Sequence, residues 1–138
     1  MWNFFTLEEG IVAILWEAKA CDLNASRSLD PSGKEKRLRQ LRNVLAQQGA
    51  PQDLLDALSE TADDFGRLRR KYRNALAHAH AFTAGYADDG TYLPGLSHVA
   101  RDGSRQKLAV EAGDLLTIAH EIEEGSRPIE TARRLLNP

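Results

Sequence analysis

The chain has 138 residues, of which 42% are hydrophobic and 28% charged, and its formal net charge is −2. These values are ordinary for one soluble domain over residues 1–138, and the single cysteine, Cys21, excludes an intramolecular disulfide and a cysteine-built zinc site. The longest apolar run, residues 11–16, is far shorter than the roughly 20 residues that a membrane span requires. Because Glu8 and Glu9 precede this run instead of basic residues, it is not typical of a signal peptide, and we expect a cytoplasmic protein.

The small net charge hides blocks of opposite charge along the chain. Residues 27–42 carry a charge of +4, residues 43–64 carry −5 and residues 65–87 carry +5. Two basic blocks in a mildly acidic protein favour a local anion-binding site over a general affinity for polyanions. Solvated helix faces explain the same pattern, so charge alone leaves both interpretations open.

The N-terminal third of the chain predicts two helices. Thr6 followed by Glu9 is typical of a capping box, and apolar side chains at helical spacing give residues 6–25 one apolar face. Asp30 is a suitable N-cap for the next helix because a proline occupies the first helical position after it. Apolar residues at helical spacing extend this second helix over residues 31–48.

The third predicted helix is the longest and extends from Pro51 to about Ala81. It follows Gly49, which suits the position after the last turn of the preceding helix. Gly66 lies inside the third helix at a cost of about 1 kcal/mol relative to alanine. One apolar stripe recurs at steps of three and four residues and predicts the face toward the core: Leu54, Leu58, Thr61, Phe65, Leu68, Tyr72, Leu76 and Ala79.

Residues 82–107 do not follow a helical pattern. Two Asp-Gly pairs, at residues 89–90 and 102–103, lie among aromatic and β-branched residues and predict a small hairpin or an ordered loop. Helical periodicity then returns, and Gly125 and Pro128 separate a last short helix. We therefore expect an all-α fold: an antiparallel four- to five-helix bundle with a small hairpin or loop insertion before the last two helices.

Common chemical signatures do not occur in this sequence. It has no glycine-rich phosphate loop and no nucleophile elbow. His78 and His80 are two residues apart, so a helix would point them about 160° from each other, and no third ligand lies nearby. Cys21 lies on an apolar face with no activating base beside it, so we interpret it as a core residue. We expect neither a metal ion nor another cofactor.

The remaining candidate is the basic stretch from Arg67 to Ala81. On a helical wheel, Arg73, Asn74 and His78 gather on the face away from the core stripe. A histidine exchanges a proton near neutral pH, a guanidinium group binds a phosphate, and an amide orients the imidazole. These three groups suffice for metal-free RNA cleavage by the neighbouring 2′-hydroxyl. A polar helix face that carries a histidine at an arbitrary position is the alternative.

The sequence Arg-Asn-Ala-Leu-Ala-His at residues 73–78 resembles the signature of the HEPN superfamily (higher eukaryotes and prokaryotes nucleotide-binding). That signature is an arginine, a polar residue directly after it and a histidine a few residues on, near the end of a long helix in a four- to five-helix bundle. The resemblance implies a metal-independent endoribonuclease of the toxin, antiviral-defence or RNA-processing type, which acts as a homodimer with a composite site at the dimer cleft. Arg73 would then stabilise the scissile phosphate, Asn74 would orient its neighbours and His78 would transfer protons.

The resemblance also implies substrate-binding residues and partners. Arg70 and Arg67, one and two turns before the motif, would extend the anion-binding strip. Some HEPN toxins carry a tyrosine two residues after the histidine, which a partner nucleotidyltransferase modifies. His80 occupies that position here, so it would supply a second imidazole or pack at the bundle edge. Beside RNA, an antitoxin or a nucleotidyltransferase is an expected partner, and we expect no membrane association and no DNA specificity. A second basic block would guide an RNA backbone if it lies on the same side: Lys34, Lys36, Arg37, Arg39 and Arg42.

Two other interpretations stay open at this point. A catalytically silent HEPN-like dimeric module would bind a nucleotide, an RNA or a protein partner through the same basic face without cleaving RNA. A plain interaction bundle would leave this face merely solvated and would be a monomer at micromolar concentration. The absence of acidic residues from Phe65 to Ala87, and the small side chains of Ala77 and Ala81, argue against the plain bundle.

Overall fold

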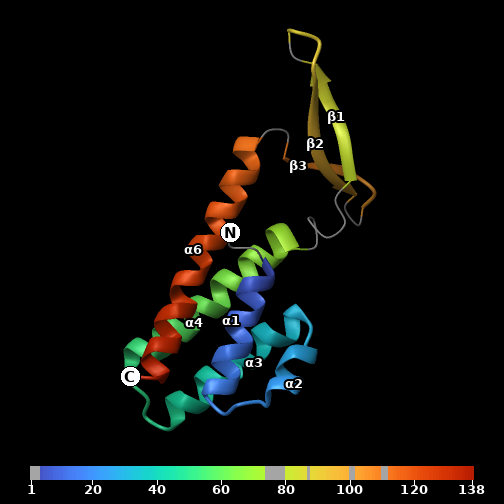
Figure 1. The fold of residues 1–138 in the computed structure, drawn as a ribbon. Coiled ribbons are helices and arrows are strands. Elements are labelled where there is room, and N and C mark those ends of the chain that lie inside the picture. The colour runs from blue at the N-terminus through green and yellow to red at the C-terminus, as the bar shows by residue number, and fades with distance from the viewer. Residues whose placement is uncertain (1–3, 74–79, 87, 100–101, 110–111) are drawn as a thin grey trace.

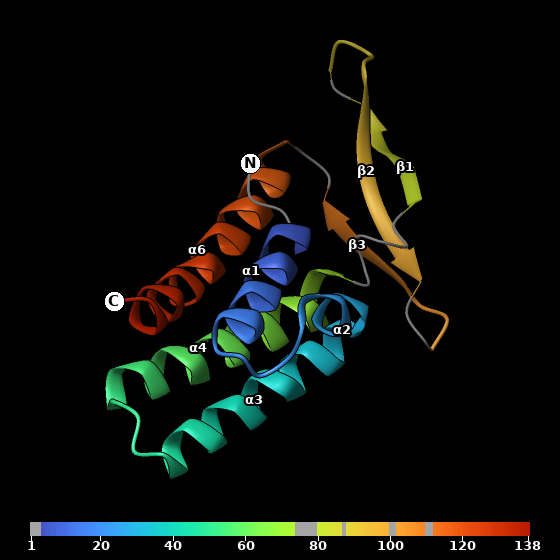
Figure 2. The same ribbon diagram turned by 60° about the horizontal axis from the view of Figure 1, so that its bottom comes forward.

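The computed structural model describes residues 4–73, 80–86, 88–99, 102–109 and 112–138. Packed helices form a bundle, and a three-stranded antiparallel sheet extends beyond one end of it (Figures 1 and 2). The elements in chain order are α1 (Phe4–Glu17), α2 (Leu23–Ser28), α3 (Pro31–Gln47), α4 (Gln52–Leu68), the π-helix η1 (Arg69–Arg73), β1 (His80–Tyr86), β2 (Tyr92–Val99), β3 (Arg105–Ala109) and α6 (Ala112–Leu136). The predicted helical bundle is confirmed, with the sheet as its insertion.

Neighbouring helices of the bundle differ in relative direction. Helix α4 runs antiparallel to α3 and to α6, as the order of their contacts shows. Helix α1 instead runs parallel to α6: Gly10 lies against Ile129, and Glu17, further along α1, pairs with Arg133 at 2.6 Å. Residues 18–30 and α2 explain this, because they lead the chain back toward the start of α1 before α3 begins.

The start of α3 follows its local sequence. Asp30 caps the helix, since its Oδ1 accepts a hydrogen bond from the Gly33 backbone N–H at 2.6 Å, and Pro31 is the first helical residue. Gly49 follows the C-cap with a φ of +77°, a left-handed conformation that glycine adopts without strain. Both predicted ends of this helix are therefore confirmed to within one residue.

The predicted first helix was wrong at both ends. Helix α1 already includes Phe4, so Thr6 lies inside it and is not its N-cap. It ends at Glu17, and a separate short helix, α2, begins after the N-cap Asp22. The apolar periodicity continues across this break because Ala18, Ala20 and Cys21 also pack against the core, so spacing alone did not reveal the turn.

The apolar stripe of α4 forms the centre of the core. Leu58, Phe65 and Leu68 are each at most 2% exposed, and the Phe65 ring lies 5.2 Å from the ring of Phe4. The predicted stripe is confirmed from Leu54 to Tyr72. Its last two members, Leu76 and Ala79, lie outside the described residues.

The long third helix does not extend to Ala81 as predicted. The α-helix ends at Leu68, and η1 follows it. His80 and Ala81 belong to strand β1, where they pair with Ser97 and Leu96 of β2. Alanine and histidine fit a helix by local preference, but pairing with a distant strand decides their conformation here.

The insertion is larger than the predicted hairpin. Strand β2 lies between β1 and β3, and both pairs are antiparallel. The two Asp-Gly pairs form the connecting turns, where Asp89 and Asp102 each accept a hydrogen bond at 2.9 Å from the backbone N–H two residues on. The turn prediction is therefore confirmed, and the sheet gains a third strand that the alternation pattern did not reveal.

The predicted break between the last two helices does not occur. Helix α6 is continuous through Gly125 and Pro128. A Cβ atom at residue 125 would lie 2.6 Å from Leu68 Cδ1, so glycine at this position allows α4 and α6 to approach each other. Gly125 thus serves close helix packing, although its sequence context is typical of a helix end. Pro128 is buried within the helix, and tertiary packing offsets its usual cost there.

Candidate nucleic-acid interface at the end of helix α4

The candidate site begins where α4 changes into the π-helix η1. A π-helical turn is wider than an α-helical one and is frequent at functional sites. Arg73 is the last residue of η1, whereas Asn74 and His78 lie outside the described residues. The proposed geometry of this motif therefore stays a prediction. His80 starts strand β1, so the position on the helical wheel that we predicted for it was wrong.

A carboxylate of α6 fixes the chain directly before Arg73. Tyr72 Oη donates a hydrogen bond to Glu121 Oε2 at 2.7 Å, and Lys71 Nζ lies 3.2 Å from the same oxygen. The hydrogen bond from Tyr72, with help from Lys71, lowers the pKa of Glu121, and burial raises the pKa of Tyr72. Glu121 is therefore ionised and Tyr72 protonated at neutral pH, which is the state in which this bond is strong.

Both substrate-binding candidates next to the motif are exposed. The side chains of Arg67 and Arg70 are 51% and 63% exposed. In the described part of the chain their ion pairs are long: Arg67 Nη2 lies 3.7 Å from Asp64 Oδ1, and Arg70 Nη1 lies 4.0 Å from Glu35 Oε1, while the charge of Arg67 also acts on Glu121. Such exposed pairs are weak. Both guanidinium groups are thus accessible to an anion, while their role in binding a substrate stays a prediction.

Glu35 of α3 organises the charged side chains between α3 and α4. Its carboxylate accepts hydrogen bonds from Arg69 Nη2 at 3.1 Å and from Arg39 Nη2 at 3.0 Å, and its side chain is only 13% exposed. Burial raises the pKa of Glu35, but the hydrogen bonds and charges of Arg39 and Arg69 outweigh burial, so the pKa is lowered. Glu35 is therefore an anion at neutral pH and holds two arginines in place.

Gly66 explains how the Glu35 carboxylate comes so close to α4. A Cβ atom at residue 66 would lie 2.6 Å from Glu35 Oε1. Any larger residue would displace the carboxylate from its two arginines. Glycine thus costs about 1 kcal/mol of helix propensity at this position and leaves room for the carboxylate.

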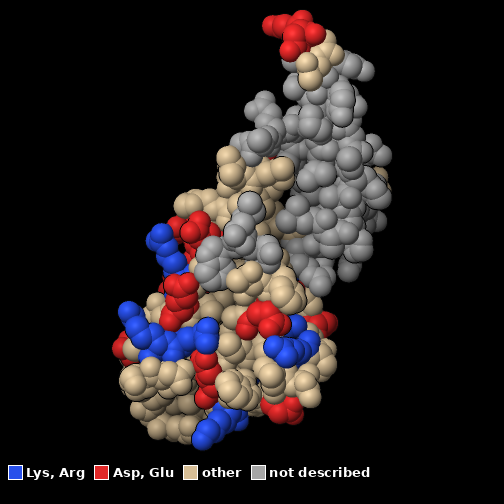
Figure 3. Space-filling view, viewed as in Figure 1, with Lys and Arg blue, Asp and Glu red and all other residues tan. Residues whose placement is uncertain are grey.

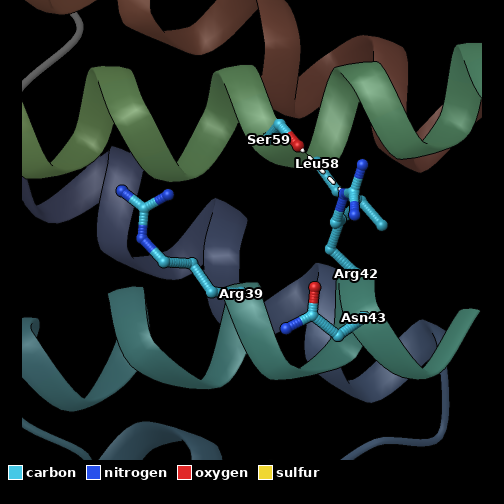
Figure 4. Close-up of a pocket in the computed structure, with 5 residues that line it drawn as sticks. All are labelled: Arg39, Arg42, Asn43, Leu58 and Ser59. Carbon is cyan, nitrogen blue, oxygen red and sulfur yellow. Dashed lines mark hydrogen bonds between the residues drawn. The ribbon is translucent and has the colours of Figure 1, made fainter. Parts of the chain in front are cut away.

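The basic block of α3 divides into two groups. Lys34 and Arg37 brace the fold, since both donate hydrogen bonds to backbone carbonyl groups of the segment between α1 and α3, at 2.6 and 3.3 Å. Arg39 and Arg42 instead line a hollow at the surface between α3 and α4 (Figure 4), and Lys36 lines a second hollow that shares Arg39 with the first. Arg37 also lines a hollow, between residues 18–20 and α3, whereas the second group lines the surface that faces α4.

The second group of α3 lies on the same side as the arginines before the motif. Glu35 joins the two elements, because it contacts Arg69 and Arg70 of η1 as well as Arg39 of its own helix. These contacts place the surface members of the α3 block beside Arg69 and Arg70, and their guidance of an RNA backbone toward the motif stays a prediction. The sequence had left this placement open.

Charge on the surface is mixed outside this region. On the face shown in Figure 3, basic and acidic side chains alternate over the bundle, and Asp88 and Asp89 form the acidic tip of the β1–β2 turn. The basic blocks of the sequence do not form one continuous positive patch on that face. A positively charged binding surface can therefore exist only locally on that face, where basic side chains outnumber acidic ones.

The two organising carboxylates could not be found from sequence patterns. Glu35 is 34 residues from Arg69, and Glu121 is 49 residues from Tyr72. Glu35 stands at helical spacing from Arg39 on its own helix, but neither acid belongs to a motif or stands at helical spacing from its partner on α4 or η1. Only the packing of α3 and α6 on either side of α4 brings these groups together.

The described part of the chain shows neither a metal site nor a membrane-spanning helix. There, no group of three His, Cys, Asp or Glu side chains could hold a metal ion, and no helix is long and apolar enough to cross a membrane. Cys21 is half-buried and packs against the core, in agreement with its interpretation as a core residue. No family model, curated protein or solved structure matches the chain. Function is therefore argued from the residues themselves.

Proposed function

We propose that this protein is a metal-independent endoribonuclease of the HEPN type that acts as a homodimer. The observation that carries the proposal is the sequence Arg73-Asn74-X-X-X-His78, which follows a long core helix directly. Its expected partner is RNA, and an antitoxin or a nucleotidyltransferase is its expected protein partner, although His80 replaces the tyrosine that such an enzyme modifies in some HEPN toxins. A toxin, defence or RNA-processing role would follow from this activity.

The chemistry needs only groups that the motif supplies. An imidazole of His78 removes the proton of a ribose 2′-hydroxyl, and the oxygen attacks the adjacent phosphorus. The bond from phosphorus to the 5′-oxygen breaks, and that oxygen takes up a proton from an imidazolium group. Arg73 stabilises the negative charge that develops on the phosphate, and Asn74 orients the imidazole. The products are a 2′,3′-cyclic phosphate and a 5′-hydroxyl.

The surroundings of the motif support this chemistry in two ways. Glu121 anchors the residue directly before Arg73 to α6, so that the first motif residue follows a fixed turn. Arg67 and Arg70 are exposed on the preceding turns and provide positive charge for a phosphate chain. A second copy of the chain would complete an enclosed site from two such surfaces.

The test is cleavage of a mixed RNA pool in the presence of EDTA. We expect the wild-type protein to produce 2′,3′-cyclic phosphate ends and His78→Ala to lose at least about a hundredfold in rate, because general acid–base catalysis contributes about 10²–10⁴. His120→Ala is the matched control, since this exposed histidine of α6 pairs only with Glu124 in the described structure, at 3.7 Å. Light scattering on the same samples reports whether the active species is a dimer.

Three results would contradict the proposal. Equal cleavage by wild type and His78→Ala would point to a contaminating nuclease. Loss of cleavage in EDTA, with recovery upon addition of a divalent metal, would contradict the metal-free mechanism. A folded dimer that binds RNA without cleaving it would favour the catalytically silent module.

A further inference from the structure

The surface between α3 and α4 carries a groove that the motif does not include. One hollow of about 270 Å³ is lined by Arg39, Arg42, Asn43, Leu58 and Ser59. A second hollow of about 360 Å³ is lined by Ser32, Glu35, Lys36, Arg39, Gln40, Asn43 and Arg69. Arg39 and Asn43 line both hollows, so the two form one groove along α3, which we call the α3–α4 groove.

Cations outnumber anions in the α3–α4 groove. Its lining includes four cationic side chains, Lys36, Arg39, Arg42 and Arg69, and one carboxylate, that of Glu35. Outside the lining, Asp63 also pairs with Arg39, at 2.9 Å. Positive charge therefore remains after these ion pairs are counted, and it belongs to Lys36 and Arg42, for which the described residues show no carboxylate in an ion pair.

Arg42 is the clearest of these cations. Its Nε donates a hydrogen bond to Ser59 Oγ at 3.2 Å, and no carboxylate pairs with its guanidinium group among the described residues. Figure 4 shows Arg39, Arg42 and Asn43 extending from α3 toward α4, with the opening between the two arginines. A half-buried guanidinium group that is oriented by a hydroxyl and lacks an acidic partner is suited to bind an anion.

The α3–α4 groove leads to the candidate site. Arg69 lines its second hollow, and Arg70, the next residue, lies 4.0 Å from Glu35 of that hollow. Arg73 is only three residues further along η1. A chain of phosphates that passes Arg70 on its way from the motif would therefore meet the groove next.

The lining also indicates which part of a nucleic acid would be bound. Apart from the Glu35 carboxylate, which two arginines already occupy, its polar groups are guanidinium, ammonium, amide and hydroxyl groups, which donate hydrogen bonds to phosphate oxygens. None of the described lining residues is aromatic, so bases would have no ring on which to stack. We propose that the α3–α4 groove is an exosite for the sugar-phosphate backbone of single-stranded RNA beyond the cleavage point. This proposal rests on the proposed function, because RNA is the ligand that the motif implies.

The test measures RNA binding in the His78→Ala background, in which the RNA is not cut. The probe is a labelled single-stranded RNA of about 20 nucleotides, long enough to pass from the motif into the groove. Its dissociation constant is measured by fluorescence anisotropy over a series of salt concentrations. The groove variant is Lys36→Ala with Arg42→Ala, and the matched control removes two exposed arginines of α6, Arg127→Ala with Arg134→Ala.

We expect the groove variant to bind the RNA about tenfold more weakly and to reduce the slope of log K against log salt by about 1.4, because each lost contact with a single-stranded phosphate removes about 0.7. The control variant should bind within about twofold of the parent. Asn43→Asp, an exposed change that places a carboxylate in the groove, should weaken binding in the same direction. Circular dichroism establishes whether each variant is folded. If the double variant does not fold, the dissociation constant of Asn43→Asp alone tests the exosite.

The outcome separates this proposal from the proposed function. A weaker, less salt-dependent complex for the groove variants supports the exosite even if the wild-type protein cleaves no RNA. Equal dissociation constants and slopes for the groove and control variants overturn the exosite, although cleavage by the wild type would still support the endoribonuclease. Absence of any salt-dependent RNA binding by the parent overturns the exosite as well.

Discussion

Helix α4 presents two faces of opposite character to its neighbours. The face toward α1 and α6 is apolar: Phe65, beside Phe4 of α1, and Leu68, beside Gly125 of α6, are almost completely buried there. The face toward α3 is charged, and it meets Glu35 and Arg39 through Arg69 and Asp63. Apolar contact stabilises the fold in proportion to the area buried, whereas paired charges lose much of their gain to desolvation and solvent screening. We therefore expect the apolar face to determine the stability of the fold and the charged face to determine what the surface binds.

The largest effect should come from the apolar face. Phe65→Ala should reduce the free energy of unfolding by about 3–5 kcal/mol, because it removes a buried aromatic side chain and leaves a cavity beside Phe4. Denaturation in urea followed by circular dichroism would measure this loss, with Phe65→Leu as a control that fills part of the space. A loss below about 1 kcal/mol would mean that the apolar face is not the main source of stability.

A smaller effect should come from the charged face. Glu35→Gln should reduce the free energy of unfolding by about 1–2 kcal/mol at pH 7, since two charge-assisted hydrogen bonds weaken while the shape is kept. Glu60→Gln, an exposed change on α4, is the matched control.

The same variant tests the ionisation of Glu35. Because the folded state lowers the pKa of Glu35, the stabilisation is complete above the unfolded pKa of about 4.3 and is lost as the pH falls through the lower folded pKa. The difference in stability between wild type and Glu35→Gln should therefore be constant from neutral pH to about 5 and shrink below about 4. A difference that grows with acid would contradict the lowered pKa.

A still smaller effect on stability should come from the contact of η1 with α6. Tyr72→Phe keeps the buried ring and removes only the hydrogen bond to Glu121, so we expect a loss of about 1 kcal/mol in the free energy of unfolding. If Glu121 also fixes the turn before Arg73, the same variant should lower the rate of RNA cleavage more than its small loss of stability explains. Thermal unfolding and the cleavage assay on one preparation would separate the two effects.

The smallest effect on stability should come from the exposed end of the charged face. Arg67→Ala removes a pair of 3.7 Å with an exposed guanidinium group and should change the free energy of unfolding by less than about 0.5 kcal/mol. It should nevertheless weaken RNA binding several-fold and lower the salt dependence, as expected for one lost phosphate contact. Unchanged RNA binding would remove Arg67 from the anion-binding strip and would restrict that strip to Arg70 and the groove.

The sequence by itself determined the features that depend on neighbours along the chain. Asp30 with Pro31 begins α3 because a side-chain acceptor and a fixed φ act within one turn. The stripe from Leu54 to Tyr72 marked the core because helical spacing alone decides which side chains share a face. The resemblance at residues 73–78 likewise depends only on the order of residues along the chain.

Tertiary structure decided the features that depend on groups far apart in the chain. Gly125 reads as a helix end but lies within α6, where it lets Leu68 approach, and His80 pairs with Ser97 in a sheet instead of extending a helix. The α3–α4 groove exists because Glu35 joins Arg69 across 34 residues of sequence, while Arg42 is left with a hydroxyl as its partner. Local sequence patterns do not predict these contacts between distant residues, because the free energy that favours them arises only when the helices and strands pack.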